Sequence, residues 1–309
     1  MTFSSDLKIA VVGSDSMVGS RFCELEHNEF KLIKADLGGE VDIDITNPLS
    51  VKSFFKRYKF DWLVLFSAFT DVDKAEQERN NKEGACWRIN VDGAYNIASA
   101  CKRYDRFLIY ISTDFVFDGI SGPYSENDEP ASDSGQVSWY GWTKLNGEKT
   151  VINSDCKFII ARISYPYRAK FLLKTDFVRN ILDRLKTGNL YPMYDDQLIS
   201  PTFIDNIVRA LACLIKAGQF GIFHIADNTV LSPYQAACEI ARVFGYNACS
   251  IKRGSLVSNM KDSSFAKRPL NGGLKNNRVQ NLLVQFGFSM LDFKNSLILM
   301  KQQIESDNL

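Results

Sequence analysis

LKIAVVGSDSMVGSRF, residues 7–22, is the stretch of sequence that decides the fold. Residues 7–12 are mostly apolar and rich in β-branched side chains, which predicts a buried strand. Gly13 and Gly19 enclose the turn that follows, and helical spacing of apolar residues begins at Ser16. A glycine turn before a helix lets backbone N–H groups approach a pyrophosphate, which the helix dipole also favours. The stretch therefore predicts a dinucleotide-binding turn. Ser16 occupies the place of the middle glycine, where its hydroxyl could contact phosphate or cap the helix.

The same alternation of strand and helix continues along the chain. Short apolar strands are expected at 31–35, 62–66, 107–112, 158–163 and 221–225, and helices at 49–57, 90–104, 176–186 and 233–244. This pattern predicts an α/β fold, a Rossmann-type doubly wound parallel sheet with helices on both faces. We expect a smaller, mainly helical C-terminal lobe that binds the substrate. The predicted units are a Rossmann domain of residues 1–165 plus about 200–230, and a lobe of residues 166–199 and 231–309.

Composition narrows the class of protein. The chain has 309 residues and a net charge of +1, which argues against a large surface for nucleic acid or anionic lipid. Its seven cysteines are scattered without a CxxC pair, and its two histidines have no plausible second ligand nearby, so we expect no metal site. No apolar run approaches the roughly 20 residues that span a bilayer. We expect a cytoplasmic protein that binds neither membrane nor nucleic acid.

Asp36 follows the second expected strand, at about the distance from the glycine turn where dinucleotide-binding proteins carry a ribose-binding acid. A carboxylate there accepts hydrogen bonds from the adenosine ribose and repels a 2′-phosphate. The cofactor expected is NADH or NADPH, and Asp36 favours NADH. A solvated turn acid is the alternative, since Asp42 and Asp44 lie close by.

Tyr140 and Lys144 form the string YGWTK, and no other tyrosine of this chain has a lysine four positions later. On a helix these side chains share a face, so the ammonium can lower the pKa of the phenol toward neutrality. Such a pair also arises by chance on amphipathic helices. Here Ser112 and Thr113, at the end of an expected strand, add a hydroxyl that could hold a carbonyl. The combination predicts a reductase in which Tyr140 protonates a carbonyl oxygen.

Several longer strings resemble the dTDP-4-dehydrorhamnose reductases, a group of the extended short-chain dehydrogenase/reductases. They are DWLVLFSAFTDVDKAE at 61–76, STDFVFDG at 112–119, YGWTKLNGE at 140–148, SPTFID at 200–205 and RPLN at 268–271. The resemblance covers nearly the whole chain. It implies a catalytic set of Thr113, Tyr140 and Lys144, and substrate contacts from Thr113, Tyr165 and Arg268. The cofactor contacts that it implies are Gly13, Ser16, Met17, Gly19, Asp36, Asp44, Ile45, Ala68, Thr70, Ser112, Tyr140 and Lys144.

The chain also departs from this group. Leu65 stands where asparagine is common, Phe115 replaces a tyrosine, and the loop 118–138 before Tyr140 is longer than usual. Because that loop borders the sugar, the identity of the sugar stays open.

The reading that follows is reduction of the 4-keto group of a nucleotide-linked 6-deoxy sugar, with the sugar nucleotide as partner and a homodimer as one option for assembly. Two alternatives are a nucleotide-sugar epimerase or dehydratase, and a non-catalytic dinucleotide-binding subunit resembling the regulatory subunit of methionine adenosyltransferase. Dehydratases need an acid pair after the strand, but Asp114 is followed here by Phe115.

Overall fold

A computed structural model describes residues 7–260 and 265–306, so the outermost ends of the predicted units, 1–6 and 307–309, lie outside it. Within these ranges a six-stranded sheet has the order β2-β1-β3-β4-β5-β9, and every pairing in it is parallel. Its strands are β1 (Lys8–Val12), β2 (Lys31–Ala35), β3 (Trp62–Leu65), β4 (Phe107–Thr113), β5 (Phe158–Ile163) and β9 (Gly221–Ile225). The predicted α/β fold with a parallel sheet is confirmed.

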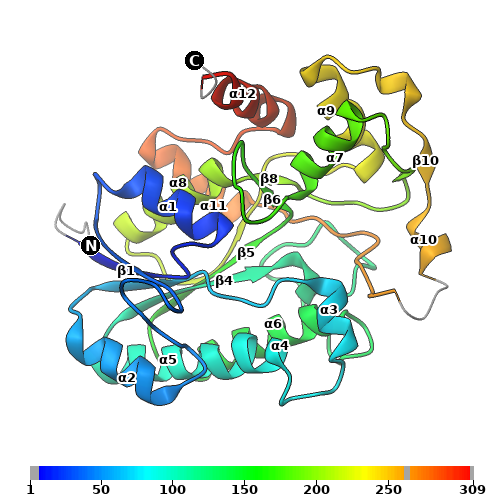
Figure 1. The fold of residues 1–309 in the computed structure, drawn as a ribbon. Helices are drawn as coiled ribbons and strands as arrows, with labels where there is room; N and C mark the ends of the chain where they lie inside the picture. The colour runs from blue at the N-terminus through cyan, green and yellow to red at the C-terminus, as the bar shows by residue number, and fades with distance from the viewer. Residues whose placement is uncertain (1–6, 261–264, 307–309) are drawn as a thin grey trace.

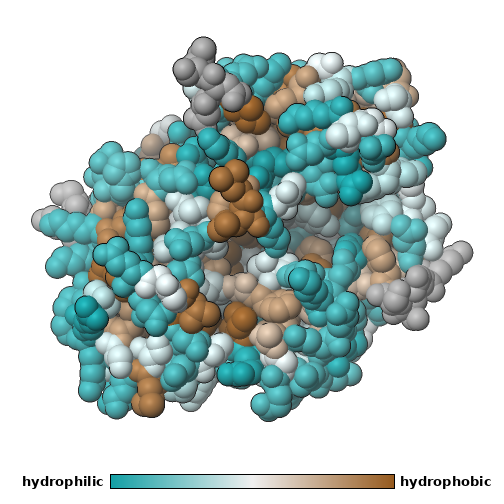
Figure 2. Space-filling model, viewed as in Figure 1, coloured by the Kyte–Doolittle hydropathy of each residue, from teal (hydrophilic) through white to brown (hydrophobic). Residues whose placement is uncertain are grey.

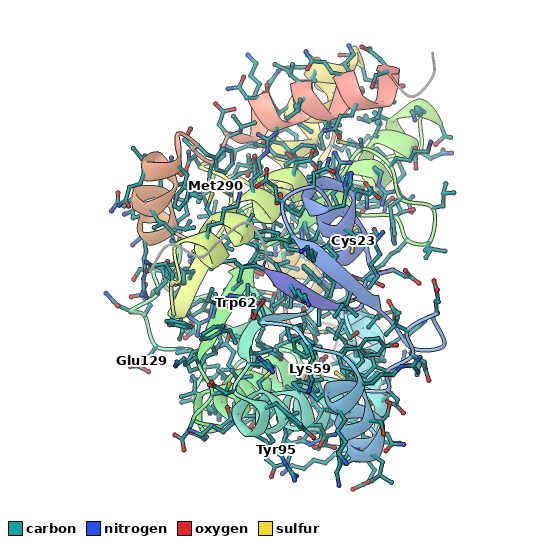
Figure 3. All side chains as sticks on the ribbon, turned by 90° about the vertical axis from the view of Figure 1, so that its left-hand side faces the viewer. Cys23, Lys59, Trp62, Tyr95, Glu129 and Met290 are labelled. Atoms are coloured by element: carbon teal, nitrogen blue, oxygen red, sulfur yellow. The ribbon has the colours of Figure 1, made fainter. Side chains whose placement is uncertain are left out.

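Helices cover both faces of this sheet (Figure 1). One face packs against α1 (Met17–Glu26), α8 (Ile204–Lys216) and α11 (Asn277–Leu283), and the other against α2 (Pro48–Arg57), α5 (Gly93–Tyr104) and α6 (Trp139–Ile152). Figure 3 shows Trp62 of the sheet between Cys23 and Met290 on one side and Tyr95 on the other. Burial of apolar side chains on both faces explains why the strands read as nearly continuous apolar runs.

A second core lies beyond the carboxyl ends of the strands. It joins α7 (Phe177–Lys186), α9 (Pro233–Phe244) and α12 (Phe293–Ser306). Two small strand pairs accompany it: β6 (Pro166–Tyr167) with β8 (Thr202–Phe203), and β7 (Met193–Tyr194) with β10 (Arg253–Gly254). The molecule is hollowed near the centre of the face seen in Figure 2. The division into two units at the stated boundaries stays a prediction.

The remaining short elements lie mostly near the cleft or in the C-terminal part. They are α3 (Val72–Gln77), α4 (Ala85–Trp87), α10 (Leu256–Asn259) and the 3-10 turns Asp114–Val116, Ala248–Ser250 and Val284–Phe286. We expected one continuous helix at 90–104, but a π-helical turn, Arg88–Asp92, precedes α5, which begins at Gly93. Asn90 in this turn is buried, and its side chain hydrogen-bonds both the N–H and the carbonyl of Phe69. Widened π turns commonly aim a side chain in this way.

Among the described residues, no helix combines the length and the apolar character that crossing a membrane requires.

Candidate active site

The glycine turn joins β1 to α1 as predicted. Gly13 has a φ of +86°, and a Cβ on it would lie 2.5 Å from the backbone nitrogen of Ser67. A Cβ on Gly19 would lie 2.2 Å from the Gly13 carbonyl oxygen. Both positions therefore require glycine. Ser16 caps α1: its hydroxyl donates to the Gly13 carbonyl at 2.7 Å and accepts from the Gly19 N–H at 3.1 Å. The side chain that replaces the middle glycine thus braces the turn.

Asp36 lies directly after β2 and beside this turn. One oxygen of its carboxylate accepts the Asp15 N–H at 2.9 Å, and the other accepts the Leu37 N–H at 2.9 Å. Both bonds fix the orientation of the carboxylate, which lines a cavity shared with the start of α1. Because each oxygen keeps a free lone pair, the carboxylate can still accept ribose hydroxyls.

The three predicted catalytic residues line one cavity of about 920 Å³. Thr113 ends β4, whereas Tyr140 and Lys144 lie one turn apart on α6. Burial raises the pKa of Tyr140 well above its ordinary value, and a hydrogen bond with Thr113 opposes the rise. This direction is opposite to the lowering that we expected from Lys144. The physical reason is that desolvation of the phenol outweighs the favourable interactions around it.

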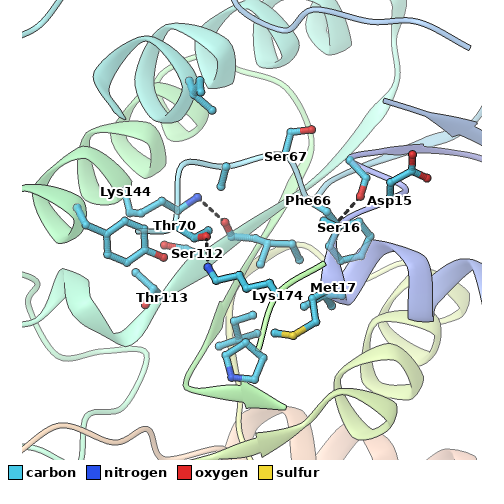
Figure 4. A pocket seen from close by; sticks show the side chains of 18 of the residues that line it. Asp15, Ser16, Met17, Phe66, Ser67, Thr70, Ser112, Thr113, Lys144 and Lys174 are labelled. Carbon is cyan, nitrogen blue, oxygen red and sulfur yellow. Dashed lines mark hydrogen bonds between the residues drawn. The ribbon is translucent and has the colours of Figure 1, made fainter. Parts of the chain in front are cut away.

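Lys144 is directed toward the backbone of the neighbouring strand. Its ammonium donates to the Ile111 carbonyl at 2.7 Å (Figure 4). It also lies 4.0 Å from the centroid of the Tyr110 ring. Burial lowers the pKa of Lys144 to about 7, against the opposing charges of Glu148 and Cys86. The Lys144 amine can therefore gain or lose its proton near neutral pH.

Most of the other predicted cofactor residues also border this cavity, Gly13, Ser16 and Met17 among them, whereas Gly19 is buried and is not among its described lining residues. Ala68 and Thr70, after β3, line it near the catalytic set, and Asp44 and Ile45 line it beyond Asp36. Ser112 lines it too, although its hydroxyl donates to the buried Glu148 carboxylate at 2.5 Å. The turn at the start of α1 and the fixed Asp36, which line the same cavity as Tyr140 and Lys144, fit a bound dinucleotide.

Of the three residues predicted to contact the substrate, Thr113 and Tyr165 line the cavity and Arg268 does not. Tyr165 lines the cavity with a φ of +41°, and its ring contacts those of Phe115 and Phe177. Arg268 is not among the described lining residues of this cavity; it pairs with Asp73 at 2.9 Å. It still lies within electrostatic range of Tyr165.

Among the lining residues that the sequence analysis did not assign to the site, Asp114 and Lys174 stand out for their chemistry. Asp114 is 2% exposed and accepts hydrogen bonds from Ser164 at 2.7 Å and Thr113 at 3.1 Å. Burial raises the pKa of Asp114 to about 6. Its position directly after Thr113 was the available signal. Lys174 reaches the cavity from a loop without periodicity, so nothing in the sequence marked it.

Comparison with known proteins places this geometry in a family. A model described as RmlD substrate binding domain matches residues 7–305. The crystal structure of a dTDP-4-dehydrorhamnose reductase from Clostridium acetobutylicum superposes with a TM-score of 0.83 at 28% identity, covering 97% of this chain and 100% of that one. A reductase of the same name from Bacillus anthracis, in complex with NADP, gives 0.82 at 25% identity over 96% and 99% of the two chains.

Two relatives with other names are also similar. The probable low-salt glycan biosynthesis reductase of Haloferax volcanii is 31% identical over 68% of this chain and 68% of its own. Methionine adenosyltransferase 2 subunit beta of Pongo abelii is 30% identical over 65% of this chain and 60% of its own. Because the family model spans nearly all of the sequence, this chain belongs to the RmlD substrate binding domain family.

Proposed function

We propose that this chain catalyses the NADH- or NADPH-dependent reduction of the 4-keto group of a nucleotide-linked 6-deoxy sugar, a step of deoxysugar and polysaccharide biosynthesis. One observation carries the proposal: Thr113, Tyr140 and Lys144 line the same cavity as the glycine turn at Gly13. Similarity to two dTDP-4-dehydrorhamnose reductase structures supports the substrate class.

The protein's own groups suit proton donation to a carbonyl. Burial keeps Tyr140 protonated at neutral pH, so its phenol is ready to donate to the substrate oxygen. Thr113 orients that oxygen with its hydroxyl. Lys144 holds the cofactor ribose, and its charge stabilises the phenolate that forms as the proton leaves. When bound, the reduced nicotinamide supplies the hydride.

We propose that NADH is preferred over NADPH. A 2′-phosphate would lie beside the Asp36 carboxylate, and Asp15 adds a second acid to this part of the lining. Among the described lining residues, the next two after Asp36 in the sequence are Leu37 and Ile43, and neither carries a positive charge. A phosphate there would meet two negative charges, whereas ribose hydroxyls would meet two acceptors.

For the sugar nucleotide, we assign Tyr165 to the sugar and Arg268 to a phosphate. The Arg268 guanidinium would exchange the exposed Asp73 carboxylate for the phosphate, since both are anionic partners of the same geometry. The proposal includes a cytoplasmic location and a homodimer as one option for the assembly.

Two alternatives differ from this reading in their chemistry. An epimerase or dehydratase would need further acid–base groups, but Asp114 is followed by Phe115, and its carboxylate is held by Ser164 and Thr113. A non-catalytic subunit is supported by the similarity to methionine adenosyltransferase 2 subunit beta. Retention of Thr113, Tyr140 and Lys144 around one cavity favours an enzyme.

The decisive assay measures oxidation of NADH and NADPH with dTDP-4-keto-6-deoxyglucose, with and without a 3,5-epimerase. We expect turnover only when the epimerised keto sugar is present. Tyr140→Phe should lower turnover by about 10²- to 10⁴-fold, the usual contribution of a general acid, while cofactor affinity is kept. Tyr95→Phe, at an exposed tyrosine of α5, is the matched control. Unchanged turnover of Tyr140→Phe would sink the mechanism, and no oxidation with any keto sugar would favour the non-catalytic subunit.

A further inference from the structure

The segment 168–176 connects β6 to α7 along the rim of the main cavity. Phe171, Leu173, Lys174 and Thr175 of this segment line the cavity. The Lys174 ammonium reaches across to the loop after β3 and donates to the Thr70 hydroxyl at 2.9 Å (Figure 4). Lys174 thus joins two segments that are 104 residues apart in the sequence.

The backbone around Lys174 is held against the first turn of α1. The Arg179 guanidinium donates to the Lys174 carbonyl at 2.6 Å and to the Phe171 carbonyl at 2.5 Å, and it also lies 3.7 Å from the sulfur of Met17. At the other end of the segment, Arg168 donates to the Met17 carbonyl at 3.2 Å. These contacts fix the Lys174 backbone close to the start of α1, the end that favours a phosphate.

The cavity lining has more acidic than basic side chains, so a bound diphosphate needs a cation close to it. Five of its described lining residues are aspartates, namely Asp15, Asp36, Asp44, Asp114 and Asp176. Three are cations, namely Arg88, Lys144 and Lys174. Since the lining is acidic overall, it opposes a ligand that carries a diphosphate unless a cation lies close to it. Lys144 is buried and bonded to the Ile111 carbonyl, so it is committed to the catalytic end of the cavity.

Lys174 is free to take a different partner. Its present hydrogen bond is to a neutral hydroxyl, and the nearby Asp71 carboxylate is already bonded to the Lys74 N–H as the cap of α3. A lysine ammonium on a flexible stem gains more from an anionic acceptor than from a hydroxyl.

We propose that Lys174 binds the diphosphate of the nicotinamide dinucleotide, exchanging its hydrogen bond with Thr70 for the phosphate oxygens. This inference rests on the dinucleotide site of the proposed function. It assigns to the loop after β6 the cation that the glycine turn itself lacks.

The test is a binding titration, which needs no turnover. NADH, NADPH, ADP, dTDP and adenosine are titrated into the wild-type protein, Lys174→Ala and Lys174→Gln, at low and high NaCl. Losing a charge-assisted bond should raise the dissociation constants of NADH and ADP by about tenfold at low salt, and by less at high salt. Adenosine, which has no phosphate, should bind all proteins equally. Lys186→Ala is the matched control, since this exposed lysine of α7 pairs with Asp183 and not with the cavity.

The outcomes separate the inference from the function on which it rests. If wild-type protein binds neither NADH nor NADPH, both are wrong. If wild-type protein binds NADH and both variants bind it equally well, Lys174 does not contact the diphosphate. A variant that loses affinity for dTDP and not for NADH assigns the lysine to the substrate instead and overturns the proposal. Equal weakening of adenosine would indicate general damage to the site and also count against it.

Discussion

Replacing Arg162 with methionine would leave the Glu148 carboxylate buried without its cation. The guanidinium of Arg162 on β5 bonds both oxygens of Glu148 on α6, at 2.9 and 2.7 Å, and the two side chains are only 2% and 1% exposed. The only other bond recorded to this carboxylate among the described residues comes from the Ser112 hydroxyl. An uncompensated buried charge of this kind costs about 3–5 kcal/mol of unfolding free energy.

Urea unfolding of Arg162→Met would measure this cost, with the slope of the transition as a check on two-state behaviour. The double variant Glu148→Leu/Arg162→Met removes the charge along with its partner, and we expect it to lie within about 2 kcal/mol of the wild type, because a buried ion pair is roughly balanced by its own desolvation. A loss below about 1 kcal/mol for Arg162→Met would refute the reasoning, as would a double variant that is as unstable as the sum of its singles.

Three other predictions concern the site. Asp36→Ala should raise the dissociation constant of NADH about tenfold or more and narrow its advantage over NADPH, whereas Glu40→Ala, at an exposed neighbour, should change neither. Lys144→Met should be more stable than the wild type below pH 7, where the wild-type protein buries a charged ammonium. Because the pKa of Lys144 is lowered to about 7, this gain in unfolding free energy should shrink by up to about 1.4 kcal/mol per pH unit from pH 7 upward. A gain that does not change with pH would contradict the prediction. Glu76→Gln removes the negative charge that accepts the backbone N–H of Trp139 at 2.9 Å and pairs with Arg79, and it should cost about 1–3 kcal/mol in thermal or urea unfolding; no loss would refute a stabilising role for this charge.

The fold was accessible from the sequence because its signals are local. Apolar strands of four to seven residues alternate with helices, and the parallel sheet has one general way of covering both faces. The helix at 90–104 was the exception, since the π turn depends on Asn90 binding the backbone of Phe69, 21 residues earlier. Residue periodicity carries no information about such a partner.

Some features of the candidate site were likewise predictable from the sequence and others were not. Gly13, Asp36, Tyr140 and Lys144 were predictable because strand ends and helix starts of a parallel sheet meet at one edge. The direction of the Tyr140 pKa was not, because it depends on how much water the finished cavity admits. Lys174 was invisible for a related reason, since its contact with Thr70 follows from two arginines that hold its loop against α1.

The string DVDKAE at 71–76 was at first only a mark of resemblance, and the structure gives three of its acids distinct physical tasks. Asp71 caps α3 through the Lys74 N–H at 3.0 Å. Asp73 pairs with Arg268, which lies 195 residues later. Glu76 accepts the N–H of Trp139, the residue before Tyr140. The short helix α3 therefore contacts both the first turn of α6 and the arginine that we assign to the substrate phosphate. The spacing of the acids in this string is therefore set by three different contacts, one that starts the helix itself and two to segments distant in the sequence, and the two distant contacts exist only in the folded chain.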